Sequence, residues 1–111
     1  MNIELREGSR ETVTFRLLRE GAAVNLSGTI DEITLYRRDA AGTLDTFTLT
    51  ANELVITDAQ KGLVSWTPGA ADIVRANGPY RVWIVLEEAN YLPKNFPEAG
   101  EMFIEVTRGL T

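Results

Sequence analysis

The residues of this sequence best suited to chemistry are its carboxylates. Glu87 and Glu88 are adjacent, and Glu98 and Glu101 flank Gly100. Paired carboxylates serve as general acid and base, or bind calcium, when their side chains converge. Adjacent residues of a strand point to opposite faces, so Glu87 and Glu88 do not share a site while the strand continues. We therefore interpret both clusters as solvated strand ends that keep a sheet edge from aggregating.

The sequence contains no histidine and no cysteine. Their absence excludes Ser-His-Asp and Cys-His catalysis and zinc sites built on imidazole. Ser9, Ser27 and Ser65 lack the Gly-x-Ser-x-Gly context of a nucleophile, and the chain has neither a glycine-rich phosphate loop nor an Asp-x-Asp-x-Asp-Gly calcium loop. We expect no catalytic residue, no metal site and no cofactor, and thus a protein that is not an enzyme.

Composition places the chain among ordinary globular proteins. Its 111 residues are 44% hydrophobic and 24% charged, which is enough for one packed core. The net charge of −5 disfavours nucleic acid and anionic membrane surfaces as partners. The N-terminal residues carry charges where a secretory signal needs an apolar run, and no segment is long enough to span a membrane. We expect a single domain over residues 1–111, made in a reducing cytoplasm, with neither nucleic acid nor membrane as partner.

The elements that position these residues are predicted by alternation. The stretch 78–86 is the longest apolar run, and its even-numbered residues from Tyr80 to Leu86 point one way while Trp83 and Val85 point the other. Shorter alternating segments recur along the chain at 1–7, 11–18, 30–38, 44–50, 54–57, 63–67 and 101–107. The spacing predicts an all-β fold, an antiparallel β-sandwich of about seven to eight short strands. At most one short helix is expected, between Gly69 and Ala76.

One local pattern indicates an immunoglobulin-like sandwich. Asp72, followed by Gly78-x-Tyr80-x-Val82, resembles the tyrosine corner that precedes the sixth strand of such domains. In that corner the tyrosine hydroxyl bonds to backbone a few residues upstream. The alternative is a tyrosine that only opens a strand.

The same topology predicts a contact surface. If the strands at 33–37, 80–87 and 102–107 are neighbours in one sheet, four large residues share its outer face: Tyr36, Trp83, Val85 and Phe103. We predict a protein–protein interface with Trp83 as its anchor. The alternative is that the loop at 87–100 folds over this face and buries it. The outer face of the opposite sheet is expected to carry Thr12, Thr14, Arg16, Thr46 and Thr48.

Three motifs follow one another along the chain. A strand at 12–17 leads through a glycine-containing turn to Ala-Val-Asn-Leu-Ser-Gly at 23–28, Lys-Gly-Leu-Val-Ser-Trp at 61–66 precedes Gly-Pro-Tyr at 78–80, and Phe-Pro-x-x-Gly at 96–100 precedes the last strand. Together they resemble the N-terminal domain of phage baseplate upper proteins, which joins receptor-binding arms to the tail. Members of that family usually continue into a stalk, so we expect either an excised domain or a short stand-alone relative.

The resemblance implies a structural role in a virion. We expect a non-enzymatic component of a phage or prophage tail or baseplate, made in the host bacterial cytoplasm and located in the virion. Its partners would be other tail or baseplate proteins and a second copy of itself. The alternative is a small-ligand or carbohydrate-binding β-sandwich module of bacterial origin, because such modules display aromatic rings on an open face or loop.

Overall fold

The computed structural model of the chain describes residues 2–28, 30–69, 72–89, 91–98 and 100–107. These residues form β-strands and one short 3-10 turn, η1 (Arg75–Asn77). The strands are β1 (Asn2–Arg6), β2 (Val13–Arg16), β3 (Leu18–Arg19), β4 (Ala22–Ala23), β5 (Ile30–Arg38), β6 (Leu44–Thr48), β7 (Leu54–Asp58), β8 (Leu63–Trp66), β9 (Tyr80–Glu88), β10 (Lys94–Phe96) and β11 (Met102–Thr107). Within the described ranges, no helix has the length and apolar character needed to cross a membrane.

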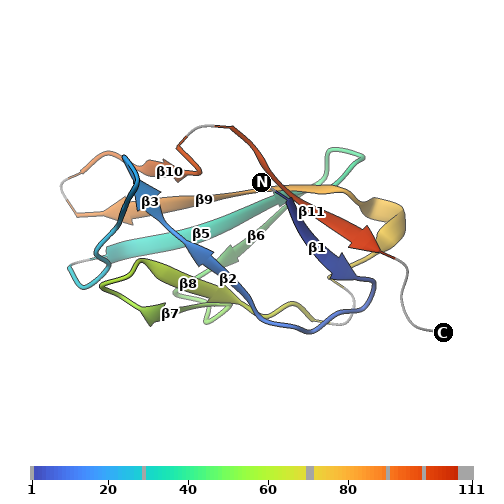
Figure 1. Cartoon of the computed structure of the whole chain (residues 1–111), viewed down its shortest axis with the longest axis horizontal. Coiled ribbons are helices and arrows are strands. Elements are labelled where there is room, and N and C mark those ends of the chain that lie inside the picture. The colour runs from blue at the N-terminus through green and yellow to red at the C-terminus, as the bar shows by residue number, and fades with distance from the viewer. Residues whose placement is uncertain (1, 29, 70–71, 90, 99, 108–111) are drawn as a thin grey trace.

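The strands form two sheets that enclose one core, as predicted for an all-β sandwich. The larger sheet has the order β1-β11-β9-β5-β6, with β10 also paired to β9, and the smaller has the order β2-β8-β7. β3 and β4 form a separate two-stranded ribbon. All pairs are antiparallel except β1 with β11, and these two strands lie side by side near the N-terminus (Figure 1).

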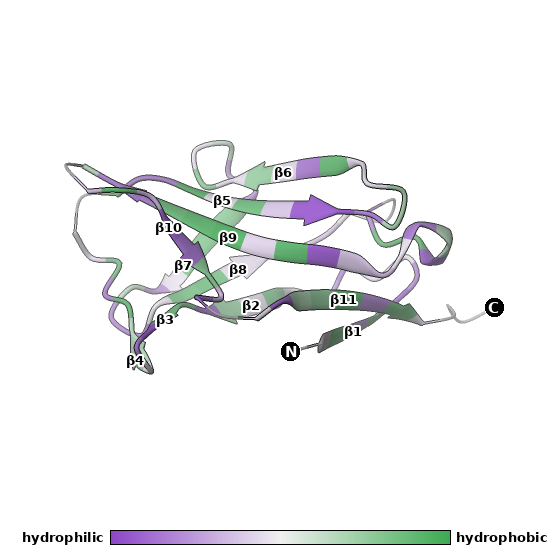
Figure 2. Cartoon of the chain, turned by 90° about the horizontal axis from the view of Figure 1, so that it is seen from above, coloured by the Kyte–Doolittle hydropathy of each residue, from purple (hydrophilic) through white to green (hydrophobic). Residues whose placement is uncertain are grey.

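The longest continuous pairing joins β5 to β9. Residues 32–38 pair in register with residues 81–87, and the register shifts at the start of β5, between Ile30 and Glu32. β11 pairs with the first part of β9, so the predicted neighbours at 33–37, 80–87 and 102–107 are neighbours. Figure 2 shows hydrophobic and hydrophilic residues alternating in the first part of β9 and a continuous hydrophobic stretch farther along it. The alternating part is the pattern of a strand with two different faces.

The core lies between the two sheets. Both sheets supply its buried side chains, and the even-numbered residues from Tyr80 to Leu86 on β9 and Val64 and Trp66 on β8 are among them. Trp66 has the same parity as Val64 along β8, and both side chains are buried.

The segment before β9 contains little helix, in agreement with the prediction of at most one short helix between Gly69 and Ala76. Its described residues hold a 3-10 turn, η1, which spans Arg75–Asn77 and so lies toward the end of the predicted range, and residues 70 and 71 lie outside the described residues. The backbone of Val74 is extended, and the Tyr80 hydroxyl lies 3.2 Å from both its N and its O. The Tyr80 hydroxyl thus hydrogen-bonds to the N–H and C=O groups of Val74, which in a continuous helix would bond to other backbone groups of that helix. Ile73 is nevertheless buried in the core.

The Tyr80 hydroxyl therefore makes the backbone contact that a tyrosine corner predicts. It accepts a hydrogen bond from the N–H of Val74 and donates one to the carbonyl of Val74, six residues upstream. Gly78 allows the chain to pass close to β11, because a Cβ added there would lie 3.1 Å from Cγ2 of Val106. Asp72 is the third residue of the predicted corner, and its side chain makes a different contact: the carboxylate accepts a hydrogen bond from the N–H of Gly69 at 2.6 Å.

The segment at 87–100, predicted as a loop, contains one strand. β10 pairs antiparallel with the second part of β9, with Phe96 opposite Ile84 and Asn95 opposite Val85. Phe96 is buried in the core, whereas Tyr91 and Leu92 of the same segment are 68% and 86% exposed. Three residues are too few for their alternation to predict a strand.

We expect Tyr80→Phe to lower the free energy of unfolding by about 1 kcal/mol, because it removes the hydroxyl that pairs with Val74 and keeps the buried ring. Chemical denaturation measures the change. The matched control is Tyr36→Phe, which removes a hydroxyl from a ring on the outer face. Equal midpoints for Tyr80→Phe and the parent would show that Tyr80 contributes packing alone.

Candidate protein interface

The predicted contact residues lie together on the outer face of the larger sheet. Tyr36 on β5 is directly opposite Trp83 on β9, and their rings stack with centroids 5.4 Å apart and an interplanar angle of 5°. The guanidinium groups of Arg38 and Arg81 lie 5.7 and 5.4 Å from the centroid of the Trp83 ring. Trp83 therefore stands at the centre of an aromatic and cationic cluster.

Val85 and Phe103 extend this cluster in opposite directions along the sheet. Val85 lies opposite Thr34 of β5 on one side and Asn95 of β10 on the other. Phe103 of β11 lies opposite Arg81. Tyr36, Trp83, Val85 and Phe103 are all partly exposed. We call these four residues the aromatic face.

Threonines border the aromatic face on β6. Thr46 is opposite Tyr36, and Thr48 is opposite Thr34. The prediction that Thr46 and Thr48 lie on the opposite sheet is therefore wrong, because β6 pairs with β5 and joins the larger sheet. β10 continues that sheet beside β9, so this strand does not cross the aromatic face.

Sequence reasoning missed the buried arginine behind this face. Arg37 is only 6% exposed, and its guanidinium carbon lies 4.5, 5.3 and 6.0 Å from the ring centroids of Tyr80, Phe47 and Trp66. The signal was present in the alternation, since Arg37 has the same parity as the inward-facing Ile33 and Leu35.

Two oxygens hold the Arg37 guanidinium at the end of the core. Its Nη2 donates to the carboxylate of Asp45 at 2.9 Å, and its Nη1 donates to the backbone carbonyl of Asp72 at 2.5 Å. Asp72 thus contributes to the corner through its backbone, because its carbonyl group accepts the hydrogen bond that links Arg37 to the turn before Tyr80. Charge-assisted hydrogen bonds and three aromatic rings offset the cost of burying this cation.

The carboxylate clusters at the strand ends make separate local contacts. Glu88 pairs with Nζ of Lys94 at 3.2 Å, Glu98 accepts from the N–H of Glu20 at 2.7 Å, and Glu101 lies 3.5 Å from Arg81. In the described part of the chain, no group of three or more acidic side chains is placed to hold a metal ion.

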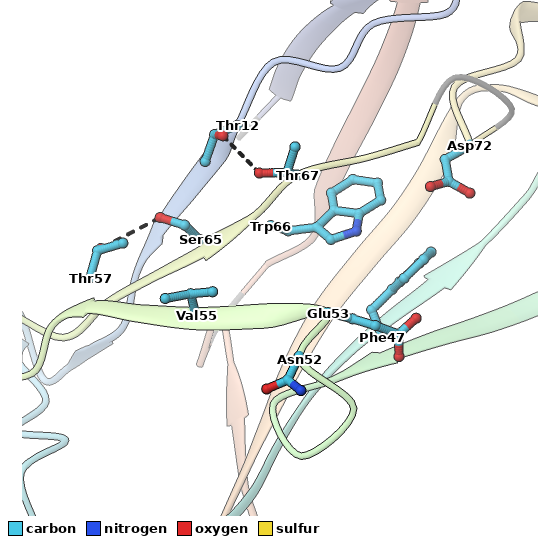
Figure 3. Close-up of a pocket in the computed structure, with 10 residues that line it drawn as sticks. All are labelled: Thr12, Phe47, Asn52, Glu53, Val55, Thr57, Ser65, Trp66, Thr67 and Asp72. Atoms are coloured by element: carbon cyan, nitrogen blue, oxygen red, sulfur yellow. Dashed lines mark hydrogen bonds between the residues drawn. The ribbon is translucent and has the colours of Figure 1, made fainter.

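A hollow of about 410 Å³ opens beside β7 and β8 (Figure 3). Hydroxyl groups line one side, where Thr12 pairs with Thr67 at 2.8 Å. Its two aromatic residues, Phe47 and Trp66, are both buried, and Trp66 is only 1% exposed. Among the described residues that line it, the hollow thus offers hydroxyls and carboxylates and no open ring on which a sugar could stack.

Glu32 lies near the start of β5, on the outer face of the larger sheet, and its pKa is below the ordinary value of a glutamate. Its carboxylate accepts hydrogen bonds from the N–H groups of Ile33 and Thr50, each at 3.1 Å, and from the Thr50 hydroxyl. Partial burial raises the pKa of Glu32, but these bonds and a backbone contact with Leu49 together outweigh it, so the net pKa lies below the ordinary value. Glu32 therefore ties the turn after β6 to β5 more strongly when it is ionised than when it is protonated.

Comparison of the chain with protein-family models and with curated proteins finds no match. The role of the aromatic face therefore has to be inferred from its geometry alone.

We expect Arg37→Met to lower the free energy of unfolding by about 2 kcal/mol, because it removes two hydrogen bonds to a charged group and keeps an unbranched side chain. Denaturation at low protein concentration measures the loss. Arg38→Met is the matched control: the neighbouring arginine is exposed on the other face, and its loss should cost no more than about 0.5 kcal/mol. Equal losses for the two variants would contradict an organising role for Arg37.

We expect Glu32→Gln to remove part of the acid sensitivity of the fold. Because the folded pKa of Glu32 is below the unfolded one, its contribution is present above about pH 4.5 and is lost as pH falls through the folded pKa. Denaturation midpoints of parent and variant should thus differ at neutral pH and converge in acid. Glu87→Gln, which removes the charge opposite Glu32, is the control. A gap that stays constant with pH would contradict the assignment.

Proposed function

We propose that this protein is a non-enzymatic structural component of a phage or prophage tail or baseplate that acts through protein–protein contacts in virion assembly. The observation that carries the proposal is the aromatic face. A stacked tyrosine–tryptophan pair, extended by Val85 and Phe103, remains partly exposed on a sheet whose other side is the core. Large rings that give contact area at low entropic cost are typical anchors of interfaces.

We also infer that the sandwich is immunoglobulin-like. The order β2-β8-β7 corresponds to strands B, E and D of that fold, and β11-β9-β5-β6 corresponds to G, F, C and C′. The hydroxyl contact of Tyr80 with Val74 supports the same inference. The three sequence motifs that resemble the N-terminal domain of baseplate upper proteins fall on this frame in order, and they favour a virion location.

The proposal is tested on phage particles induced from the bacterium that carries the coding sequence. Antibodies raised against the chain should label the tail or baseplate in electron micrographs. We expect Trp83→Ser with Phe103→Ser to remain folded and to reduce incorporation at least about tenfold, since both rings leave the contact surface. Val55→Ser is the matched control, because Val55 is 56% exposed on β7 of the other sheet.

Three results would contradict the proposal. Particles that carry no label would remove the virion role. Normal incorporation of the double variant would show that the aromatic face is not the contact surface. Loss of the fold in the double variant, measured by circular dichroism on the isolated protein, would show that these rings belong to the core.

A further inference from the structure

We propose that the aromatic face binds the same face of a second copy of this chain, about a two-fold axis that crosses the strands at Leu35 and Ile84. This inference rests on the proposed function, in that it takes the face to be a contact surface, and it names the partner. Its basis is the arrangement of charge along the β5–β9 pairing.

The outer face of that pairing carries opposite charges at its two ends. Between residues 32–38 and 81–87 the register is continuous, and Leu35 opposite Ile84 is its midpoint. Four directly opposed outer-face pairs follow one another along it: Arg38–Arg81, Tyr36–Trp83, Thr34–Val85 and Glu32–Glu87. A positive pair and a negative pair are thus equally distant from the midpoint, and uncharged side chains lie between them.

Each of the two charged pairs opposes like charges across neighbouring strands, which is unfavourable within one chain. Local contacts offset part of this cost. Arg38 and Arg81 both lie over the Trp83 ring, and Arg81 also lies 3.5 Å from Glu101. A surface that placed the acidic pair over the basic pair would relieve both repulsions together.

A second copy supplies that surface when its larger sheet faces the larger sheet of the first copy, with the two-fold axis between these two facing sheets and perpendicular to the strands. This operation keeps β9 over β9 and β5 over β5 but reverses their directions, so Arg81 faces Glu87 of the other copy and Arg38 faces its Glu32. An axis parallel to the strands would instead place arginine over arginine. Charge complementarity therefore selects the crossing axis.

The same operation matches large side chains to small ones. Trp83 comes to lie over Val85 of the other copy, and Tyr36 over its Thr34, which has a short side chain. The contact is modest in size. Seven residues at about 3.3 Å and four strands at about 4.8 Å span a face of roughly 23 by 19 Å, which predicts a weak, concentration-dependent dimer.

The test is sedimentation velocity of the 111-residue chain from about 5 to 500 μM, the range in which an interface of this size associates. We expect the parent to dimerise. Arg81→Glu alone and Glu87→Arg alone should each raise the dissociation constant at least about tenfold, because each sets like charges against one another twice per dimer. An equimolar mixture of the two variants should form a heterodimer, and the double variant R81E/E87R should dimerise again.

Weakening by each single variant followed by recovery in the double variant is specific to the crossing axis, because an axis that runs along the strands between β5 and β9 would set Arg81 over Arg38 of the other copy, and Arg81→Glu alone would then strengthen the contact. A parent that stays monomeric at every concentration overturns the inference, as do single variants that dimerise normally or a double variant that does not recover. Circular dichroism of each variant checks its fold. The proposed virion role fails separately, by absence of label on particles, and a monomeric parent leaves that result unchanged.

Discussion

The pairing of β5 with β9 is the constraint on which the rest of the structure depends. Seven residues of each strand pair in unbroken register, and successive residues face the core and the outer surface in turn. A slip of one residue would exchange the two faces along the whole ladder. The buried position of Leu35 and the stacking of Tyr36 on Trp83 are therefore consequences of one choice of register.

Arg37 fixes that register from inside the sandwich. Its guanidinium lies among three core rings and reaches both the Asp45 carboxylate and the Asp72 carbonyl, which only an inward-facing side chain at this level can do. A slip would turn Arg37 outward and leave the Asp72 carbonyl without it. The buried cation thus contributes to the specificity of strand pairing in addition to stability. The same register determines which side chains form the aromatic face on the other side of the sheet.

Alternation predicted much of this arrangement and failed where other interactions decide. It placed Trp83 with Phe103 on one outer face, because a period of two is robust in strands that are buried on one side. It could not assign β6 to a sheet, since alternation does not specify partners. The parity of Arg37 matched that of core residues, but the burial of a cation was not predicted, because it depends on rings and oxygens distant in sequence.

Fluorine NMR of the chain labelled with 5-fluorotryptophan tests most directly the claim that β9 separates a closed core from a contact surface. The chain has two tryptophans, so two resonances are expected, and Trp83→Phe assigns them. As protein concentration rises, the Trp83 resonance should shift or broaden while that of the buried Trp66 stays fixed. Two resonances that both remain unchanged, or that move together, would contradict the account.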